Sequence, residues 1–573
     1  MWAGLAAADW LAIGAYFVLI TIVGLAASRH VSNMASFIMP RRFGKLMMLM
    51  HSFGTSTHSD QAVSVASKSY TNGLSGIWYQ WMWLFATPFF WLIAPMMRRF
   101  RALTTADVFT ARFNQSVAML FAVFGLGKFI VTIGTMLKGS SAVIEACTDS
   151  AVSAEFAVAA MTVMFVIYGI AGGLGAAIVT DFIQGVLTIV FSFLLLPYVL
   201  DAVGGLPGMR TSIHEITGKG DEMMSLVVPG EIGVFYIVVI ALNSLLGVVV
   251  QPHNMGTCAA GRTELDGAVG FMGGTFLKRI CTVAWCLTGL AAVAYFNGKL
   301  DDPDQVYGRM AREFLPQIAP GLLGLFIAGL LATVMGSCDS FMIASSGLIT
   351  ENLYKPLRPG KSEGHYLIVA RVSALVVVLG GVGYAYWLDD VIQGLENLWK
   401  INTMMAMAFW LGIFWRRTTP AGAWAATLAA AGTWWLTTLP QVVSGLAKLP
   451  FSEELNFVTE KAGAMEIYLP WQMIFYITAG FAAGIFVSLF TRPVSATKLD
   501  SFYALMRTPV RPGEEIETPC TLPADAVVPP RRVFFPKSNW EIPIPGWRAV
   551  SGFLVGWILV ALIIGAVAWG IAG

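Results

Sequence analysis

Long apolar runs fill most of this chain and limit its fold more strongly than any other feature. Of the 573 residues, 56% are hydrophobic and only 12% are charged, whereas a typical soluble protein has about 25% charged residues. A helix needs about 20 apolar residues to cross a bilayer. Such runs are read at 8–28, 46–71, 76–97, 116–146, 154–172, 176–200, 232–257, 275–297, 319–350, 367–387, 389–414, 420–438, 470–491 and 547–572. The sequence therefore predicts an all-α, multi-pass membrane protein with about fourteen transmembrane helices.

Lys and Arg residues are concentrated in alternate loops, beginning with the loop after the first run. These are Arg29, Arg41, Arg42, Lys45, Arg98, Arg99, Arg101, Arg112, Arg262, Lys278, Arg279, Lys355, Arg358, Lys361, Arg416, Arg417 and the basic residues from Arg492 to Arg548. Loops enriched in Lys and Arg face the cytoplasm. With an even number of spans, both termini are predicted to lie outside a plasma or inner membrane. The first run lacks a basic leader and a cleavage site, so it is predicted to be a retained span.

The polar segment at 493–545 divides the chain into three parts. Residues 1–492 are predicted to form the transmembrane domain, and the proline-rich segment a cytoplasmic linker. A final transmembrane helix is predicted at 547–573.

Two of the apolar runs are interrupted by polar residues, proline and glycine. The second contains His51-Ser-Phe-Gly-Thr-Ser-Thr-His-Ser-Asp-Gln61, and the seventh ends in Gln251-Pro-His-Asn-Met-Gly-Thr257. Irregular backbone at membrane depth is tolerated only where it is buried in protein or lines a cavity. Transporters place solute and ion sites at such paired breaks. Because the breaks are five spans apart, two five-helix repeats are predicted at about 46–200 and about 232–414, with further spans at 420–491.

Several polar side chains are predicted to lie within the membrane. Asp181 follows a glycine-rich apolar run, and a carboxylate at that depth marks a functional site. The ninth span places hydroxyls and a carboxylate on neighbouring turns, at Thr333, Ser337, Asp339 and Ser340.

The membrane charges predicted from the sequence are Asp60, Asp181 and Asp339 against Lys128 and Lys400. Their sum of −1 would be balanced by one monovalent cation, by a protonated carboxylate or by a neutral lysine. The histidines in the breaks, His58 and His253, are interpreted either as proton-responsive groups or as hydrogen-bonded structural residues.

Other functions find little support in the sequence. A net charge of +2 gives no indication of a nucleic-acid partner. The six cysteines and six histidines follow no disulfide or metal-ligand spacing, so neither an enzyme nor a cofactor is predicted. The partners expected are a small solute, a coupling ion and the lipid bilayer.

Four motifs resemble those of the sodium:solute symporter family, which includes the sodium/galactose, sodium/proline and sodium/sialate transporters. They are Asp9-Trp-Leu with Phe37-Ile-Met-Pro-Arg-Arg42, Gly172-Gly-Leu-Gly-Ala-Ala-Ile-Val-Thr-Asp181, Gln251-Pro-His-Asn254, and Met335-Gly-Ser-Cys-Asp-Ser340 continuing to Ile349-Thr-Glu-Asn-Leu-Tyr354. The resemblance covers roughly 8–500. It implies the leucine-transporter type of fold, with two inverted five-helix repeats and extra flanking helices.

The resemblance also implies sodium-binding positions. The shared site would use the backbone at Gly54 and Thr57 with Thr333, Gly336 and Ser337. A second site would use Asp181, Asp339 and Ser340. The family has a hydroxyl where this chain has Gly336, so one oxygen ligand is missing. That departure is compatible with a weaker site, with a water in the gap, or with proton coupling.

The sodium/sugar branch of the family implies a solute site as well. Its register places Asp60, Gln61 and Gln80 on the solute, with Tyr79 as a lid, and we add His253 and Lys400 as solute-facing residues. Carboxylate and amide groups suit a polyhydroxylated or cationic solute, whereas Lys400 suits a carboxylated one. The sequence therefore predicts sodium-coupled symport of a small polar organic solute by alternating access. The alternatives are proton coupling and a membrane sensor that has lost transport.

Overall fold

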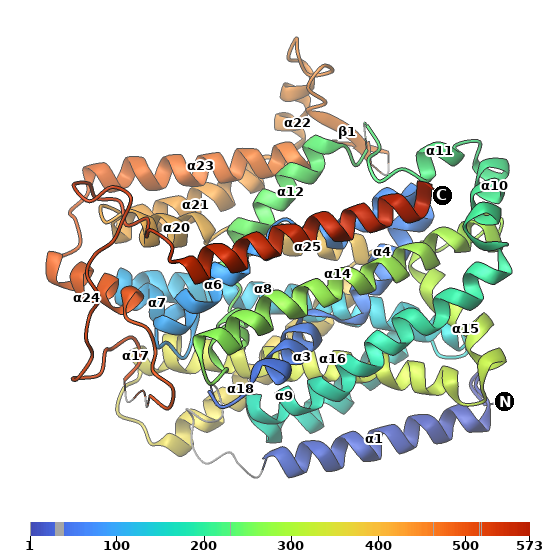
Figure 1. Cartoon of the computed structure of the whole chain (residues 1–573), viewed down its shortest axis with the longest axis horizontal. Coiled ribbons are helices and arrows are strands. Elements are labelled where there is room, and N and C mark those ends of the chain that lie inside the picture. Colours follow the sequence, from blue (N-terminus) through green and yellow to red (C-terminus); the bar gives the residue numbers. More distant parts are fainter. Residues whose placement is uncertain are drawn as a thin grey trace.

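The structure is a bundle of helices, most of which run along one axis of the molecule (Figure 1). The computed structural model describes residues 2–28, 39, 41–229, 231–461, 463–514, 516 and 518–572, except for the side chains of 24, 25, 27, 28, 164, 165, 167–177, 339, 461 and 572. In this part of the chain the only strands are β1 (Val458–Lys461) and β2 (Ala464–Ile467), an antiparallel hairpin. The all-α class predicted from the sequence is confirmed.

The first half of the bundle contains the first predicted break. Its elements are α1 (Ala7–Ser28), α3 (Lys45–Ser56), α4 (Ser59–Asn72), η1 (Gly73–Ile77), α5 (Trp78–Trp81), α6 (Thr87–Arg99), α7 (Thr105–Arg112), α8 (Gln115–Cys147), α9 (Ala154–Ala202), α10 (Gly205–Thr217) and α11 (Gly220–Met223). Thr57 and His58 are extended and separate α3 from α4. The second predicted span is therefore a broken helix, as expected.

The second half contains the second break. Its elements are α12 (Val234–Gly247), η2 (Val248–Val250), α13 (Asn254–Ala259), α14 (Glu264–Tyr295), η3 (Pro303–Gln305), α15 (Val306–Ile318), α16 (Leu322–Gly347), η4 (Leu348–Tyr354), α17 (Lys355–Leu357), α18 (Glu363–Trp387), α19 (Val391–Thr403) and α20 (Ala406–Phe414). Gln251 is extended, and Asn254 Nδ2 donates across the break to the Val248 carbonyl at 2.8 Å. A further interruption between α19 and α20, at Met404 and Met405, was not predicted.

The remaining elements are α21 (Pro420–Leu436), α22 (Pro440–Ala447), α23 (Leu469–Phe490), α24 (Ala496–Arg507) and α25 (Trp547–Ala572). The predicted linker thus includes one short helix. Its irregular part is held against the end of the bundle, where the Arg101 guanidinium donates to the carbonyls of Thr508 and Pro509 at 3.1 Å. The predicted last span is formed by α25, which packs against α6.

The predicted separation between the spans at 154–172 and 176–200 is absent, because α9 is a single helix of 49 residues. The residues between them, at 173–175, belong to the glycine-rich stretch that precedes Asp181. Glycine weakens a helix by only about 1 kcal/mol, and no proline interrupts the run before Pro197. At 1.5 Å per residue, α9 is more than twice as long as a ~30 Å hydrocarbon layer is thick.

Seven helices in the described part are long and apolar enough to cross a membrane. They are Gln115–Cys147, Ile178–Ala202, Glu264–Tyr295, Leu322–Leu357, Glu363–Trp387, Leu469–Phe490 and Trp547–Ile571. Several other predicted spans are divided into shorter helices, including α3 with 12 residues and α4 with 14. A multi-pass membrane protein is supported, and the exact number of fourteen spans is not.

Helix α14 packs against both halves of the first broken helix and against α6. It begins at a capping box formed by Thr263 and Asp266, eleven residues before the predicted start. Lys278 and Arg279, predicted to lie in a cytoplasmic loop, are therefore in the interior of α14. They are only 4% and 3% exposed, so their placement in a loop was wrong.

Both ends of the described chain lie at the same end of the bundle, the C-terminus beside α10 and α11 and the N-terminus at the opposite side of that end, at the lower right of Figure 1. At the opposite end lie α7, α17 and α24. This arrangement agrees with an even number of crossings between the two termini.

Candidate ion and solute site

The first helix break brings two helix ends of opposite polarity together. The carboxylate of Asp60 lies in the first turn of α4, where the helix dipole favours negative charge. Lys278 Nζ donates to the Ser56 carbonyl at the last turn of α3, where the dipole favours positive charge. The break is thus stabilised by side chains of the protein itself.

Asp181 is tied to α3 just before the break. This carboxylate is 1% exposed, and its Oδ2 lies 2.8 Å from His51 Nδ1 and accepts a hydrogen bond from Thr55 Oγ1 at 3.1 Å. Both donor side chains come from α3, whereas Asp181 belongs to α9. Buried carboxylates need such partners, and here the partners join two helices.

Two glycines let α3 and α16 approach Asp181 closely. A Cβ on Gly54 would lie 3.0 Å from the Asp181 Cβ. A Cβ on Gly336 would lie 2.8 Å from Asp181 Oδ1 and would collide with Gln184 Oε1. The family has a hydroxyl side chain where this chain has Gly336. Here the amide oxygen of Gln184, on α9, fills the space that such a side chain would occupy.

Three buried hydroxyls around the break lack a hydrogen-bond partner in the described part of the chain. They belong to Thr57, Ser337 and Ser340. The Thr333 hydroxyl donates to the Leu330 carbonyl of its own helix at 2.7 Å. Unsatisfied buried hydroxyls are costly, and neutral oxygens of this kind suit a monovalent cation at a broken helix. The side chain of Asp339, also predicted to bind sodium, lies outside the described residues.

One pocket lies on each side of the first break. The pocket beside α4 has a cavity volume of about 30 Å³ and is lined by Thr57, His58 and Thr333 together with residues of α9 and α15. The pocket beside α3 has a similar cavity volume of about 30 Å³ and is lined by His51, Ser340 and residues of the second break. Since α3 and α4 precede and follow the break, the pockets approach it from opposite sides.

The predicted solute residues Asp60 and Gln61 lie together at the start of α4. His58 Nδ1 contacts Asp60 Oδ1, and Gln61 Nε2 lies 3.5 Å from His58 Nδ1. Gln61 Oε1 is buried and has no hydrogen-bond partner among the described atoms. This group offers one unused acceptor at the break.

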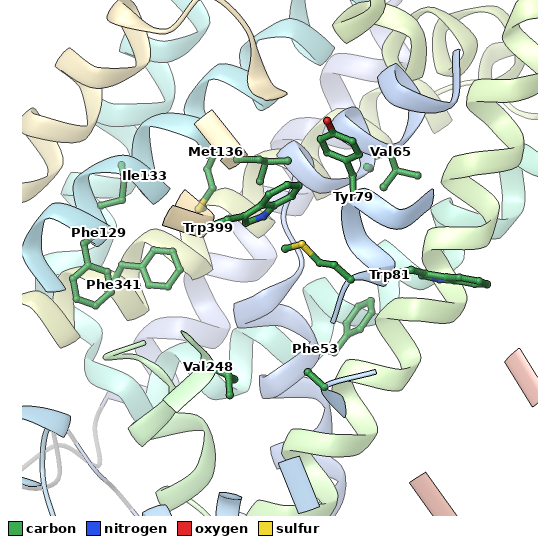
Figure 2. Close-up of a cluster of buried hydrophobic side chains, with 14 of the residues drawn as sticks. Phe53, Val65, Tyr79, Trp81, Phe129, Ile133, Met136, Val248, Phe341 and Trp399 are labelled. Atoms are coloured by element: carbon green, nitrogen blue, oxygen red, sulfur yellow. The ribbon is translucent and has the colours of Figure 1, made fainter. Parts of the chain in front are cut away.

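Tyr79 lies apart from that group, against α19. Its ring centroid is 5.3 Å from that of Trp399, and its hydroxyl donates to Glu396 Oε1 at 3.4 Å. Figure 2 shows these two rings together in the buried cluster. Lys400 follows Trp399 in α19 and is half-buried. Gln80 Oε1 accepts from Arg279 Nη1 of α14 at 3.4 Å, so the predicted solute residues fall into separate groups.

At the second break, His253 contacts a lysine of α8. Its Nδ1 lies 3.1 Å from Lys128 Nζ. That ammonium lies 4.8 Å from the Phe341 ring centroid and 5.3 Å from that of Phe129. His58 and His253 both meet Phe341 edge to face, at 6.3 Å and 5.2 Å between ring centroids. Phe341 of α16 therefore links the two breaks, and Figure 2 shows it beside Phe129.

Sequence reasoning did not assign several residues to this site. They are His51, Thr55, Gln184, Lys278 and Phe341, together with Lys128, which was selected only as a membrane charge. Gln184 carried a usable signal, because it lies three residues after Asp181 and so on the same helix face. The position of Phe341 relative to both breaks depends on the packing of α16 and had no signal in its own segment.

A family model described as "Sodium:solute symporter family" matches residues 36–430. The chain is 25% identical over 505 residues to the osmoregulated proline transporter OpuE of Bacillus subtilis, covering 85% of this chain and 96% of the relative. It is also 25% identical over 448 residues to a sodium/proline symporter of Staphylococcus aureus, covering 73% and 83%.

Solved structures show the same arrangement of helices. A Na⁺-coupled sialic acid symporter in a substrate-bound outward-open state superposes with a TM-score of 0.67 at 15% identity, covering 86% of this chain and 99% of the other. Mhp1, a nucleobase-cation-symport-1 family transporter, gives a TM-score of 0.50 at 11% identity, covering 81% and 98%. Both are transporters of the leucine-transporter fold, so the predicted fold type is supported.

Proposed function

Because the chain belongs to the sodium:solute symporter family, we propose that it is a secondary active transporter that carries a small polar organic solute together with sodium. The observation that carries the proposal is the cluster of oxygens around the first break. It combines the Asp181 carboxylate with unpartnered buried hydroxyls from the break and from α16. Proline is the first candidate solute, because the two curated relatives are named as proline transporters.

Sodium would bind between the first break and α16, near Asp181 Oδ1, Gln184 Oε1 and the hydroxyls of Thr57 and Ser337. A cation there adds attraction between α3, α9 and α16, and so favours the conformation in which these helices meet. The pockets on the two sides of the break are the natural routes for alternating access. A second sodium at Asp181, Asp339 and Ser340 remains a prediction.

The membrane orientation belongs to the same proposal. The end of the bundle that carries α7, α17 and α24 (Figure 1) would face the cytoplasm, because the loops there include many of the Arg and Lys residues. Both termini would then lie outside a plasma or inner membrane. A membrane potential of 100 mV would supply about 2.3 kcal/mol for each sodium that enters.

Uptake of radiolabelled proline into proteoliposomes tests this function. An inward sodium gradient is expected to drive accumulation above equilibrium, and a proton gradient of equal size without sodium is not. Asp201→Asn, at an exposed position near the end of α9, is the control for the Asp181→Asn variant in this assay. If proline fails, the same assay is run with galactose, N-acetylneuraminate and lactate. Sodium-independent facilitated entry of every solute would contradict symport.

Proton coupling is a second candidate, and the contact between His51 and Asp181 favours it. An imidazole 2.8 Å from the only described carboxylate at this side of the break offers a proton-binding group where the family has its ion site. Accumulation driven by the proton gradient alone would select this candidate over sodium coupling.

A further inference from the structure

Lys128 is a buried cation without a carboxylate partner among the described side chains. It is 4% exposed and lies on α8, with Nζ 3.1 Å from His253 Nδ1 and above two phenylalanine rings. Each ring face attracts the ammonium less strongly than a carboxylate would. A buried charge normally has an opposite charge beside it, and no described side chain supplies one here.

A charged Lys128 would fix which nitrogen of His253 carries the proton. A lysine ammonium donates hydrogen bonds and cannot accept them. His253 must therefore accept at Nδ1, which places its own proton on Nε2. The imidazole then presents an N–H donor that is polarised by the ammonium behind it. Together the two residues form a donor relay that suits an anion.

The relay borders the pocket beside α3. His253 lines this pocket together with Pro252 and Ser340, and the Ser340 hydroxyl is buried without a described partner. Helix α8 reaches the same place, because a Cβ on Gly125, one turn before Lys128, would lie 3.0 Å from Pro252 Cγ. A small anion in the pocket would lie against His253 and Ser340, and His253 is in contact with Lys128.

We propose that Lys128 and His253 bind the carboxylate of the transported solute, with the Ser340 hydroxyl as a further donor. The ligand class is a small carboxylic acid or amino acid. This rests on the proposed function in one respect, since the ligand is taken to be the solute. An uncharged polyol would leave Lys128 without a counter-charge, and a cation would be repelled by it.

Binding to detergent-purified protein tests the proposal without requiring transport. The probes are L-proline with L-prolinamide, lactate with lactamide, N-acetylneuraminate with its methyl ester, and galactose. Each carboxylate differs from its partner only in the group that the relay would hold. We expect thermal stabilisation by at least one carboxylate, and at least about tenfold weaker affinity for its partner that lacks the carboxylate.

Lys128→Met should weaken binding of that carboxylate by about 30-fold or more, and Lys128→Arg should restore part of it. Methionine fills a similar volume without a charge that must be buried, so the ligand-free variant should unfold at the same or a higher temperature. His253→Leu should weaken binding as well, because it removes the N–H donor. Lys138→Met, at a half-buried position on the same helix, is the matched control and should bind as the wild type does.

Three results would overturn the assignment: a neutral probe that binds more tightly than every carboxylate, no stabilisation by any carboxylate, or unchanged carboxylate affinity in a folded Lys128→Met protein. The proposed function fails separately. Carboxylate binding without sodium-driven uptake would support the Lys128–His253 site and reject symport. Sodium-driven uptake of galactose alone would support symport and reject the carboxylate site.

Discussion

The two helix breaks are alike in backbone and opposite in charge. At the first, His51 contacts Asp181, His58 contacts Asp60, and Lys278 donates to the Ser56 carbonyl. Each of these charged or polar groups has a partner within the protein. At the second, the contact of His253 is with Lys128, and no described carboxylate completes the pair. Among the described side chains, the charged groups at the first break all have partners, whereas Lys128 at the second break has no carboxylate partner.

This difference is the basis on which we propose different tasks for the two breaks. Hydroxyls and one carboxylate edge remain for a small cation at the first break, and N–H donors remain for an anionic group at the second. Phe341 touches side chains of both. A solute that moves His253 would therefore press on the same ring that packs against His58, which provides a physical contact between the two sites.

Among the variants, Asp181→Asn should have the largest effect on transport. The substitution removes the negative charge from the first break while leaving His51 buried beside it. Truncating one partner of a buried charged pair costs about 3–5 kcal/mol, so sodium-driven uptake should fall by at least about 100-fold. Uptake in proteoliposomes measures this, with Asp201→Asn as the control. Full sodium-driven uptake in the Asn variant would show that the charge of Asp181 is not needed.

Gly336→Ser tests whether Gln184 has replaced the family hydroxyl. The new side chain would meet Gln184 Oε1 and Asp181 Oδ1, and overpacking of this kind costs about 1–3 kcal/mol. We expect a lower unfolding temperature in detergent, partly recovered by adding Gln184→Ala. Gly329→Ala on the same helix is the control, because its Cβ would lie 4.0 Å from the Leu187 Cβ. Equal stability of Gly336→Ser and the wild type would show that Gln184 does not fill this space.

Ser337→Ala tests whether the ion site at the first break can be altered without affecting the second break. Loss of one neutral oxygen ligand should raise the sodium concentration for half-maximal uptake by about 5-fold, the equivalent of about 1 kcal/mol. Carboxylate binding at the second break should change little when sodium is saturating. Ser345→Ala is the control, since the Ser345 hydroxyl already donates to the Met342 carbonyl at 3.0 Å. An unchanged sodium dependence would remove Ser337 from the ion site.

Asp304→Asn should have the smallest effect and should spare both breaks. Asp304 lies in η3, outside the membrane-spanning helices, where burial, with Asp302 and Asp390 nearby, raises its pKa to about 6. Its folded pKa is above the ordinary 3.8, so the folded protein takes up the proton first as the pH falls. Stability should be gained as the pH falls through about 6 and lost as it rises.

The Asn variant should lack this dependence and still accept from the Val391 N–H, which donates to Asp304 at 3.0 Å. Unfolding temperatures of both proteins, measured between about pH 5 and about pH 8, would reveal it. Parallel curves for the two proteins would show that Asp304 does not titrate in this range.

The pattern of local residues predicted the breaks, because polar residues and Pro252 within apolar runs favour irregular, protein-buried backbone at membrane depth. The same reasoning failed at α9, where two separate spans were predicted and the helix is continuous. It failed again at Lys278, which was placed in a loop because of its charge and is buried within α14. The Ser56 carbonyl that accepts from Lys278 is 222 residues away in the sequence, and no local pattern announces such a partner.

The sequence by itself determined that the chain is a helical membrane protein with two interrupted helices and a carboxylate at depth. These features follow from hydropathy and from backbone hydrogen bonding, which act over a few neighbouring residues. Only the tertiary structure decided that Asp181 meets His51, that Gln184 fills the space beside Gly336, and that Lys128 lies behind His253. Those contacts join residues more than a hundred positions apart. Hydrogen bonds and van der Waals contacts act over a few ångströms, so these pairs interact only after the helices have packed.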